Sequence, residues 1–407
     1  MSNTPNIRFK GFTDDWEQRK VTDLGEIYIG LVTTMTEHYT DKGHLLIRNS
    51  DIKDGYFEFG ENPIYLDEEF SEQNKSRMHQ LGDVITVHTG DIGTSAVIGE
   101  NEVNSIGFAT IVTRPNKEIL DSNFFATYLN TDTHKQWAIS MATGDGRSNY
   151  NLKDYTKLIV PVPQIEEQKK IASCICNLNN LITLHQRKCD ETKELKKYML
   201  QKMFPQQGEK KPAIRFEGFT DDWEQRKLGD LLNETREKTS VEDEDTLLSC
   251  AIDGMFLNSE LFSHFRGSSN IGYLKVKKND LILSAQNLHL GNCNVNLRFE
   301  HGIISPAYKV YELINCDPLF MQAWVKQDKT KDFFLKASTE GASVCRKNIV
   351  WEDLYKQELP VPKINEQVKI GAFFQNLDNL ITLHQRKCDE MKELKNFMLQ
   401  NMFPKKG

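Results

Sequence analysis

The chain has 407 residues, 39% of them hydrophobic and 27% charged, which is enough for two or three domains that each bury a core. The formal net charge of −7 excludes a protein that holds nucleic acid by bulk positive charge, although local basic loops can still read a sequence. Apolar runs are only a few residues long, and the N-terminus lacks the basic and apolar pattern of a secretory signal. We therefore expect a cytoplasmic protein with no membrane contact.

Two passages of the sequence occur twice almost letter for letter. Ile7 to Lys20 returns as Ile214 to Lys227 with one difference in 14 positions. Leu178 to Pro205 returns as Leu377 to Pro404, and 23 of the 28 positions are identical. The passages between these repeats do not resemble each other. A fixed frame that carries two divergent modules predicts a protein that recognises two different things at once.

The first divergent passage, module 1, runs from Gln18 to Val160 and is expected to be mixed α/β. Alternating residues from His44 to Phe59 predict a strand, a turn at Asp54-Gly55 and a second strand. Leu81 to Glu100 predicts another hairpin with a glycine-containing turn, and Asn123 to Ser140 predicts one helix.

A long helix is predicted after module 1, because apolar residues recur at spacings of three and four from about Gln164 to Phe204. Pro205 is expected to end it. A helix of roughly 35 to 40 residues would be about 50 to 60 Å long. Its predicted buried seam consists of Ile171, Ile175, Leu178 and Ile182.

The second divergent passage, module 2, runs from Gln225 to Leu359 and predicts similar elements at comparable places. Hairpins are expected over Thr246 to Phe262 and Lys277 to Leu297, and a helical stretch over Asp317 to Lys336. A second long helix follows and should end at Pro404. Its predicted seam consists of Ile370, Phe374, Leu377 and Ile381.

Two near-identical helices that are too weakly apolar to stand alone in water are natural partners for each other. If a pseudo-twofold axis relates the halves, the helices pair antiparallel and their contacts are reciprocal. The expected fold is α+β, with two α/β domains joined by two long antiparallel helices that form a coiled-coil spacer. The alternative is that each helix packs only on its own module. The expected boundaries are 1–160 and 214–359 for the domains, 161–205 and 360–407 for the spacers, and 206–213 for a linker.

Motifs for chemistry inside the chain are missing. The eight cysteines form no CxxC pair, and neither HExxH nor a GxxxxGK[ST] phosphate loop occurs. Asn62-Pro63-Ile64-Tyr65 and Asp317-Pro318-Leu319-Phe320 come near the base-binding turn of amino-methyltransferases, but both lack its second proline. Asp317-Pro318 instead predicts a helix start. We expect no catalytic residue, no metal site and no cofactor in this chain.

The arrangement resembles the DNA-specificity subunits of type I restriction-modification systems over essentially the whole chain. The resemblance rests on the two modules, the repeated helices and the hairpin of Gly82 to Gly93. It also rests on the helix entries PVPQIEEQKKI, Pro161 to Ile171, and PVPKINEQVKI, Pro360 to Ile370. Module 2 departs from the hairpin pattern, because Asn279-Asp280 replaces the first Gly-Asp.

The resemblance implies that each module is a target-recognition domain for one half of a split double-stranded DNA target, while the helices set the gap. It further implies that two methyltransferase subunits dock on the chain, bind S-adenosylmethionine and methylate the DNA. Motor-nuclease subunits would complete the restriction complex. The sequence also leaves open a rival interpretation, in which the chain is a protein-interaction scaffold that never touches DNA.

Candidates for DNA contact are polar loop residues that can reach base edges or phosphates, since Arg pairs with guanine and Asn with adenine. For each of these residues the alternative is that it lies in an ordinary solvated loop and does not contact DNA. The first candidates precede the two Pro-x-Pro entries, and they are Arg147, Ser148, Asn149, Arg346, Lys347 and Asn348. The others are Arg48, Asn49, Ser50, His88, Thr89, Gln286, Asn287 and His289.

Overall fold

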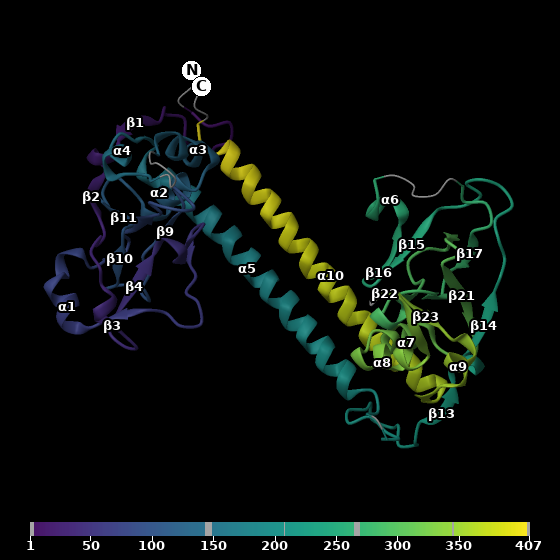
Figure 1. The fold of residues 1–407 in the computed structure, drawn as a ribbon. Helices are drawn as coiled ribbons and strands as arrows, with labels where there is room; N and C mark the ends of the chain where they lie inside the picture. Colours follow the sequence, from purple (N-terminus) through teal and green to yellow (C-terminus); the bar gives the residue numbers. More distant parts are fainter. Residues whose placement is uncertain (1–3, 143–148, 207, 264–268, 344–345, 405–407) are drawn as a thin grey trace. The chain divides into compact units, whose positions relative to one another are not determined.

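The computed structural model describes residues 4–142, 149–206, 208–263, 269–343 and 346–404. For residues 340–343 and 346 the structure describes the backbone but not the side chains. The chain divides into two compact units (Figure 1). Unit 1 comprises residues 1–185 and 386–407, and unit 2 comprises residues 186–385.

The elements of unit 1 are mostly short strands followed by a group of helices. They are β1 (Glu17–Lys20), η1 (Val21–Asp23), β2 (Gly25–Ile29), η2 (Thr36–His38), β3 (Tyr39–Thr40), β4 (His44–Arg48), η3 (Asn49–Asp51), β5 (Ile52–Lys53), β6 (Tyr56–Phe57), β7 (Tyr65–Leu66), α1 (Glu68–Gln73), η4 (Lys75–Arg77), β8 (Val84–Thr86), β9 (Ser95–Val97), β10 (Ile106–Phe108), β11 (Ile111–Pro115), α2 (Ser122–Leu129), α3 (Asp132–Met141), α4 (Leu152–Tyr155) and β12 (Ile159–Val162). The long helix α5 (Ile165–Lys202) begins in this unit and ends in unit 2.

The elements of unit 2 follow a related order. They are β13 (Glu224–Lys227), η5 (Leu228–Leu231), β14 (Leu232–Thr235), β15 (Leu248–Ala251), β16 (Gly254–Leu257), α6 (Asn258–Leu261), β17 (Leu274–Lys277), β18 (Leu281–Ser284), η6 (Leu288–Leu290), β19 (Cys293–Val295), β20 (His301–Ile304), β21 (Tyr308–Leu313), α7 (Pro318–Val325), α8 (Asp328–Lys336), β22 (Ser338–Ser343), β23 (Arg346–Ile349), α9 (Trp351–Lys356) and β24 (Glu358–Val361). The long helix α10 (Ile364–Asn401) begins in this unit and ends in unit 1.

Each unit contains its own antiparallel four-stranded sheet, and the two sheets have the same topology. The strand order is β2-β11-β8-β9 in unit 1 and β14-β21-β18-β19 in unit 2. Helix α2 packs on β8 and β9, and α7 packs on β19, so the main core of each unit lies between this sheet and its helices. The hairpins predicted over 81–100, 246–262 and 277–297 are confirmed as β8–β9, β15–β16 and β18–β19.

The single helix predicted over Asn123 to Ser140 is wrong, because two helices, α2 and α3, occupy this stretch. Thr131 separates them in an extended conformation, and its hydroxyl accepts a hydrogen bond from the backbone N–H of His134. A side chain that caps a new helix in this way competes with continuation of the preceding one. Unit 2 also breaks, at Gln327, which is extended but makes no side-chain capping hydrogen bond, whereas α7 starts as predicted, with Asp317 as N-cap and Pro318 at its first position.

The strand, turn and strand predicted over His44 to Phe59 are only partly confirmed. A hairpin does turn at Asp54-Gly55, but its strands β5 and β6 have two residues each. The longer strand β4 instead pairs with β7 and, in parallel, with β10. These non-local partners carry no signal in the local alternation of residues.

The repeated segments close each unit rather than lying apart from the modules. Strand β1, from the first repeat, pairs antiparallel with β12, which contains Pro161, and β13 pairs with β24 in the same register. Trp16 is buried and packs edge-on against Phe403, which follows α10. Trp223 packs likewise against Phe204, which follows α5. Each unit is thus completed by the far end of a helix that starts in the other unit.

The predicted long helices are confirmed, at 38 residues each. Within each unit the two helix segments run antiparallel (Figure 1). In unit 2 the Cys189 thiol lies 3.8 Å from the carbonyl oxygen of Ile381. In unit 1 the repeat mates Cys388 and Ile182 make the same contact at 3.9 Å. The contacts are therefore reciprocal, as a pseudo-twofold relation requires.

The predicted seam residues lie on the packed face of these helices. Three in each helix are buried, whereas Ile182 and Ile381 are half-buried beside the partner helix; the buried ones are Ile171, Ile175, Leu178, Ile370, Phe374 and Leu377. Ile171 belongs to the core of unit 1, and Ile370, Phe374 and Leu377 belong to the core of unit 2. The start of each helix therefore packs on its own module, but the alternative that each helix packs only there is wrong, because the two helices also contact each other. In the described parts of the chain, no helix is long and apolar enough to cross a bilayer.

Candidate nucleic-acid interface

Three segments far apart in the sequence of module 1 meet at one polar cluster. They are the start of η3 at Asn49, the tip of the β8–β9 hairpin at His88 and Thr89, and the strand-like residue Asn149. The backbone N–H of His88 donates to Asn49 Oδ1 at 2.8 Å, and Thr89 Oγ1 donates to Asn149 Oδ1 at 2.7 Å. We call these four residues cluster 1.

The hydrogen bonds of cluster 1 determine which ring nitrogen of His88 carries a proton, and burial determines the charge of the ring. Because the Thr89 hydroxyl donates to Asn149, it accepts from His88 Nδ1, which lies 2.7 Å away. Burial lowers the pKa of His88 below its usual value, opposed by the hydrogen bond between the His88 ring and the Asn151 side chain. The imidazole is therefore neutral near pH 7, so cluster 1 presents hydrogen-bonding groups rather than charge.

The hairpin tip is held by packing that the sequence encodes locally. Gly90 and Gly93 adopt positive φ angles of +104° and +85°, which only glycine adopts without strain. A Cβ at Gly93 would lie 3.2 Å from the His134 ring and 3.3 Å from Ala138, so the tip rests closely on α3. The Thr94 hydroxyl donates to Asp91 Oδ2 across the turn. This packing fixes His88 and Thr89 relative to the helices.

Asn49 is anchored from its other side as well, since its Nδ2 donates to the carbonyl oxygens of Phe108 and Ala109. Its neighbour Arg48 donates through Nε and Nη2 to the buried carboxylate of Asp51, which raises the pKa of Arg48. That ion pair adds no net charge to the surface, and it orders η3. Ser50 is exposed beside it.

Module 2 brings together its own equivalents of two of these segments. Gln286 and Asn287 form the tip of the β18–β19 hairpin, where both backbone N–H groups donate to Ser284 Oγ. The backbone N–H of Lys347, in β23, donates to the carbonyl oxygen of Gln286 at 3.2 Å. We call Gln286, Asn287, Lys347 and Asn348 cluster 2.

Cluster 2 borders a cavity of about 500 Å³ that the sequence did not predict. Polar side chains of Asn258, Tyr273 and Ser305 line it together with Gln286 and Asn287. These residues come from separate loops and from the start of α6 and share no motif, so no sequence signal could have grouped them. Asn348 is exposed on β23, opposite Thr339 of β22.

Not every predicted contact residue lies in these clusters. His289 is 8% exposed within η6, so its ring faces the protein and we leave it out of the interface. Arg147 and Ser148 lie outside the described residues. For Arg346 only the backbone is described, as the first residue of β23.

Both modules therefore place the segment before the Pro-x-Pro entry against the tip of the equivalent hairpin, while the side chains presented there differ. Comparison with known proteins shows that the two halves of the chain match the same family. The family described as Type I restriction modification DNA specificity domain matches the chain twice, over residues 13–194 and 220–393. The chain belongs to this family.

Individual relatives support membership of the family along the whole chain. A putative type I restriction enzyme MjaX specificity subunit from Methanocaldococcus jannaschii is 23% identical over 410 aligned positions, covering 94% of this chain and 91% of the relative. The MjaVIII specificity subunit of the same organism is 22% identical and covers 79% of this chain and 78% of its own. The crystal structure of the type I restriction-modification S subunit from M. genitalium aligns with 99% of this chain and 100% of its own. Its TM-score is 0.62 at 15% identity, which shows a shared fold.

Proposed function

We propose that this chain is the DNA-specificity subunit of a type I restriction-modification complex and that each module reads one half of a bipartite double-stranded DNA target. The observation that carries the proposal is that the family domain occurs twice, once over each divergent module. Two different modules on one repeated frame suit a target whose two halves differ in sequence.

Clusters 1 and 2 are the proposed sites of base readout. Asn149 and Asn348 carry carboxamides, which can pair with adenine through a donor and an acceptor. Thr89, Gln286 and Lys347 add groups that can reach base edges or phosphates. Arg147, Ser148 and Arg346 belong to the same proposed segments by their place in the sequence, and Arg48 and Ser50 border cluster 1 on either side of its member Asn49.

We further propose that the chain is not itself a catalyst. Two methyltransferase subunits would dock on it, hold S-adenosylmethionine and transfer the methyl group, and motor-nuclease subunits would complete the restriction complex. The sequence of this chain contains no glycine-rich cofactor loop or complete base-binding turn, in keeping with this division of labour. The long helices α5 and α10 are the proposed ruler for the gap between half-sites.

Methylome sequencing of cells with and without this gene tests the proposal directly. The expected result is a split motif, methylated in both halves, that disappears on deletion and returns on complementation. Exchange of module 1 for that of a related subunit should then alter one half of the motif only. A methylome that does not change on deletion, in cells that express a partner methyltransferase, would contradict the proposal.

A further inference from the structure

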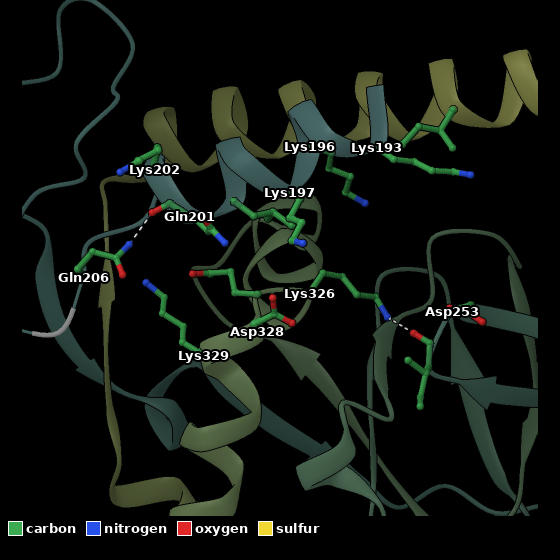
Figure 2. Close-up of a pocket in the computed structure, with 14 residues that line it drawn as sticks. Lys193, Lys196, Lys197, Gln201, Lys202, Gln206, Asp253, Lys326, Asp328 and Lys329 are labelled. Atoms are coloured by element: carbon green, nitrogen blue, oxygen red, sulfur yellow. Dashed lines mark hydrogen bonds between the residues drawn. The ribbon is translucent and has the colours of Figure 1, made fainter. Parts of the chain in front are cut away.

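A lysine-rich cavity of about 1,000 Å³ lies in unit 2, away from cluster 2 in the sequence. Figure 2 shows lysines of α5 on one side of this space and residues of the α7–α8 corner on the other. Among the residues that the structure describes, six lysines and two aspartates, Asp253 and Asp328, line it. The lysines are Lys193, Lys196, Lys197, Lys202, Lys326 and Lys329. Lys196 and Lys193 form ion pairs with Asp378 and Asp190, and the other four lysines leave a local excess of positive charge on a chain whose net charge is −7.

The lysines at the floor of the cavity are only partly compensated by the protein. Lys326 donates to the carbonyl oxygens of Ile252 and Cys293, and Lys329 donates to that of Pro205. Burial lowers the pKa of both ammonium groups. Carbonyl oxygens satisfy hydrogen bonds without neutralising the charge, so an anion that enters the cavity would interact favourably with both lysines.

The equivalent cavity in unit 1 lacks this charge. It is lined by residues at the same places in the fold, including Asn130, Thr133 and Asn396, with one lysine against two aspartates. The repeated helices differ at only five of 28 positions, and two of these differences replace Lys197 and Lys202 by Asn396 and Asn401. The basic cavity is therefore a property of one unit and not of the repeated frame.

The composition of the cavity favours nucleic acid over a protein partner. Among its described lining residues only Leu200, Ile252 and Ile381 are apolar and none is aromatic, whereas protein interfaces are enriched in aromatic residues. Lysines act as point charges that position phosphates without selecting bases. The cavity also borders α8, which packs on η6 beside the hairpin tip of cluster 2. Lys331 of the same helix lies against Gly291 of that hairpin.

We infer that this cavity binds backbone phosphates of DNA and anchors the target on the unit 2 side only. The inference rests on the proposed function, because the DNA is the one that cluster 2 would read. Phosphate contacts there would raise affinity for all sequences alike and would leave the choice of half-site to the clusters.

The test removes two lysines and follows the salt dependence of DNA binding. Lys197 is exposed, and Lys329 at the start of α8 is exposed along most of its side chain although its ammonium group is partly desolvated, so the double variant Lys197→Gln/Lys329→Gln should fold. The matched control is Lys188→Gln/Lys227→Gln. Lys188 is exposed on α5 nine residues before Lys197 and thus on roughly the opposite face, and Lys227 is exposed on β13. All proteins are assembled with the methyltransferase partner and titrated with duplexes that carry the intact or the scrambled motif.

Each lost phosphate contact reduces the slope of log affinity against log salt concentration by about 0.9. The slope of the double variant should therefore be smaller by about 1.8 than that of the wild type. The preference of the double variant for the intact motif should not change, and the control should keep the wild-type slope. An unchanged slope in a folded double variant, or an equal loss in the control, would overturn the inference. The inference would also be overturned if the only effect of the double substitution were that the protein no longer assembles with its methyltransferase partner, or if the cavity bound inorganic phosphate but the substitution left DNA binding unchanged. If wild type itself shows no preference for the motif, it is the proposed function that fails.

Discussion

Arg8 holds the carboxylate of Glu167 through two hydrogen bonds, at 2.8 Å from Nε and 2.7 Å from Nη2. The glutamate side chain is 1% exposed, in the first turn of α5, whereas the arginine comes from the repeated N-terminal segment. Unit 2 repeats the pair as Arg215 and Glu366, at 2.7 and 2.8 Å. The repeated segment is therefore tied to the start of the repeated helix in both units by the same ion pair.

The first prediction concerns this pair. Replacing Arg8 by Met should lower the free energy of unfolding of unit 1 by about 3 kcal/mol or more, because it leaves a buried carboxylate without its counter-charge. Adding Glu167→Leu should recover most of the loss, since an apolar pair of similar size needs no counter-charge. Thermal unfolding of the full chain measures both effects.

The control for this prediction is an exposed ion pair in the same unit. Arg19 binds Glu17 at 2.7 Å, with side chains 38% and 67% exposed. Solvent screens such a pair, so Arg19→Met should change stability by no more than about 1 kcal/mol. Equal losses from Arg8→Met and Arg19→Met would show that burial of Glu167 does not govern the effect.

The second prediction concerns Asp280, which is 3% exposed and lies immediately before β18. Its counterpart in unit 1, Asp83, forms an ion pair with Arg114 at 2.9 Å, but the register places Glu312 where Arg114 would stand. Burial, with a further contribution from Glu312, raises the pKa of Asp280 to about 6. Asp280→Asn should therefore raise the free energy of unfolding at pH 7.5 by about 1 to 2 kcal/mol.

The direction with pH follows from linkage. A carboxyl whose pKa is raised on folding favours the folded state at low pH, and this contribution is lost as the pH rises from about 4 to about 6. The advantage of Asp280→Asn should thus shrink toward pH 4, as urea unfolding at several pH values will show. Asp83→Asn is the matched control and should destabilise, since it breaks the ion pair with Arg114. Stabilisation by both variants would refute the electrostatic explanation.

The features of the fold and of the clusters that the sequence predicts are those encoded by neighbouring residues. The long helices, the hairpins at Gly90 and Gly291 and the helix start at Asp317-Pro318 follow from spacing and turn chemistry, and the structure has them. The break at Thr131 was missed because a capping hydroxyl inside an apolar pattern resembles any other threonine. Cluster 1 was predicted as three separate loops. That Asn49, Thr89 and Asn149 meet depends on tertiary packing, which no local pattern encodes.

The third prediction compares two asparagines at equivalent places in the two modules. Asn149→Ala and Asn348→Ala should each reduce the affinity of the assembled complex for its target by about 1 to 3 kcal/mol if the carboxamide pairs with a base. Asn149→Ala should relax the choice of base in one half-site and Asn348→Ala in the other. Binding to a library of duplexes with single changes along the motif measures both.

The unaffected half-site is the internal control for each asparagine variant, because it shares the same complex, partner and salt. A loss spread evenly over all duplexes would mean that the residue positions phosphates rather than reads bases. Loss of preference in both half-sites from one substitution would contradict independent readout by the two modules.

The fourth prediction concerns the long helices as a ruler. Ile182 lies opposite Cys388 in unit 1, and Cys189 lies opposite Ile381 in unit 2, and the repeat mates His185 and His384 fall between these contact residues in the sequence of each helix. Seven residues inserted after both histidines would lengthen each helix by about 10 Å and keep the seam in phase, because seven residues make nearly two turns. We expect unchanged half-sites with a preferred gap longer by about three base pairs, given a rise of 3.4 Å per base pair. Methylome sequencing of cells that carry the variant reads out the gap.

Insertion in one helix alone is the matched control. Seven residues after His185 only would lengthen α5 by two turns but not α10, so the contact of Ile182 with Cys388 in unit 1 and that of Cys189 with Ile381 in unit 2 cannot both be kept. Because the contacts of the two helices are reciprocal, this variant should lose stability without defining a new gap. If the double insertion folds, assembles with its partners and keeps the original gap, the helices do not set the distance between half-sites, and the modules must be positioned by the partner subunits instead.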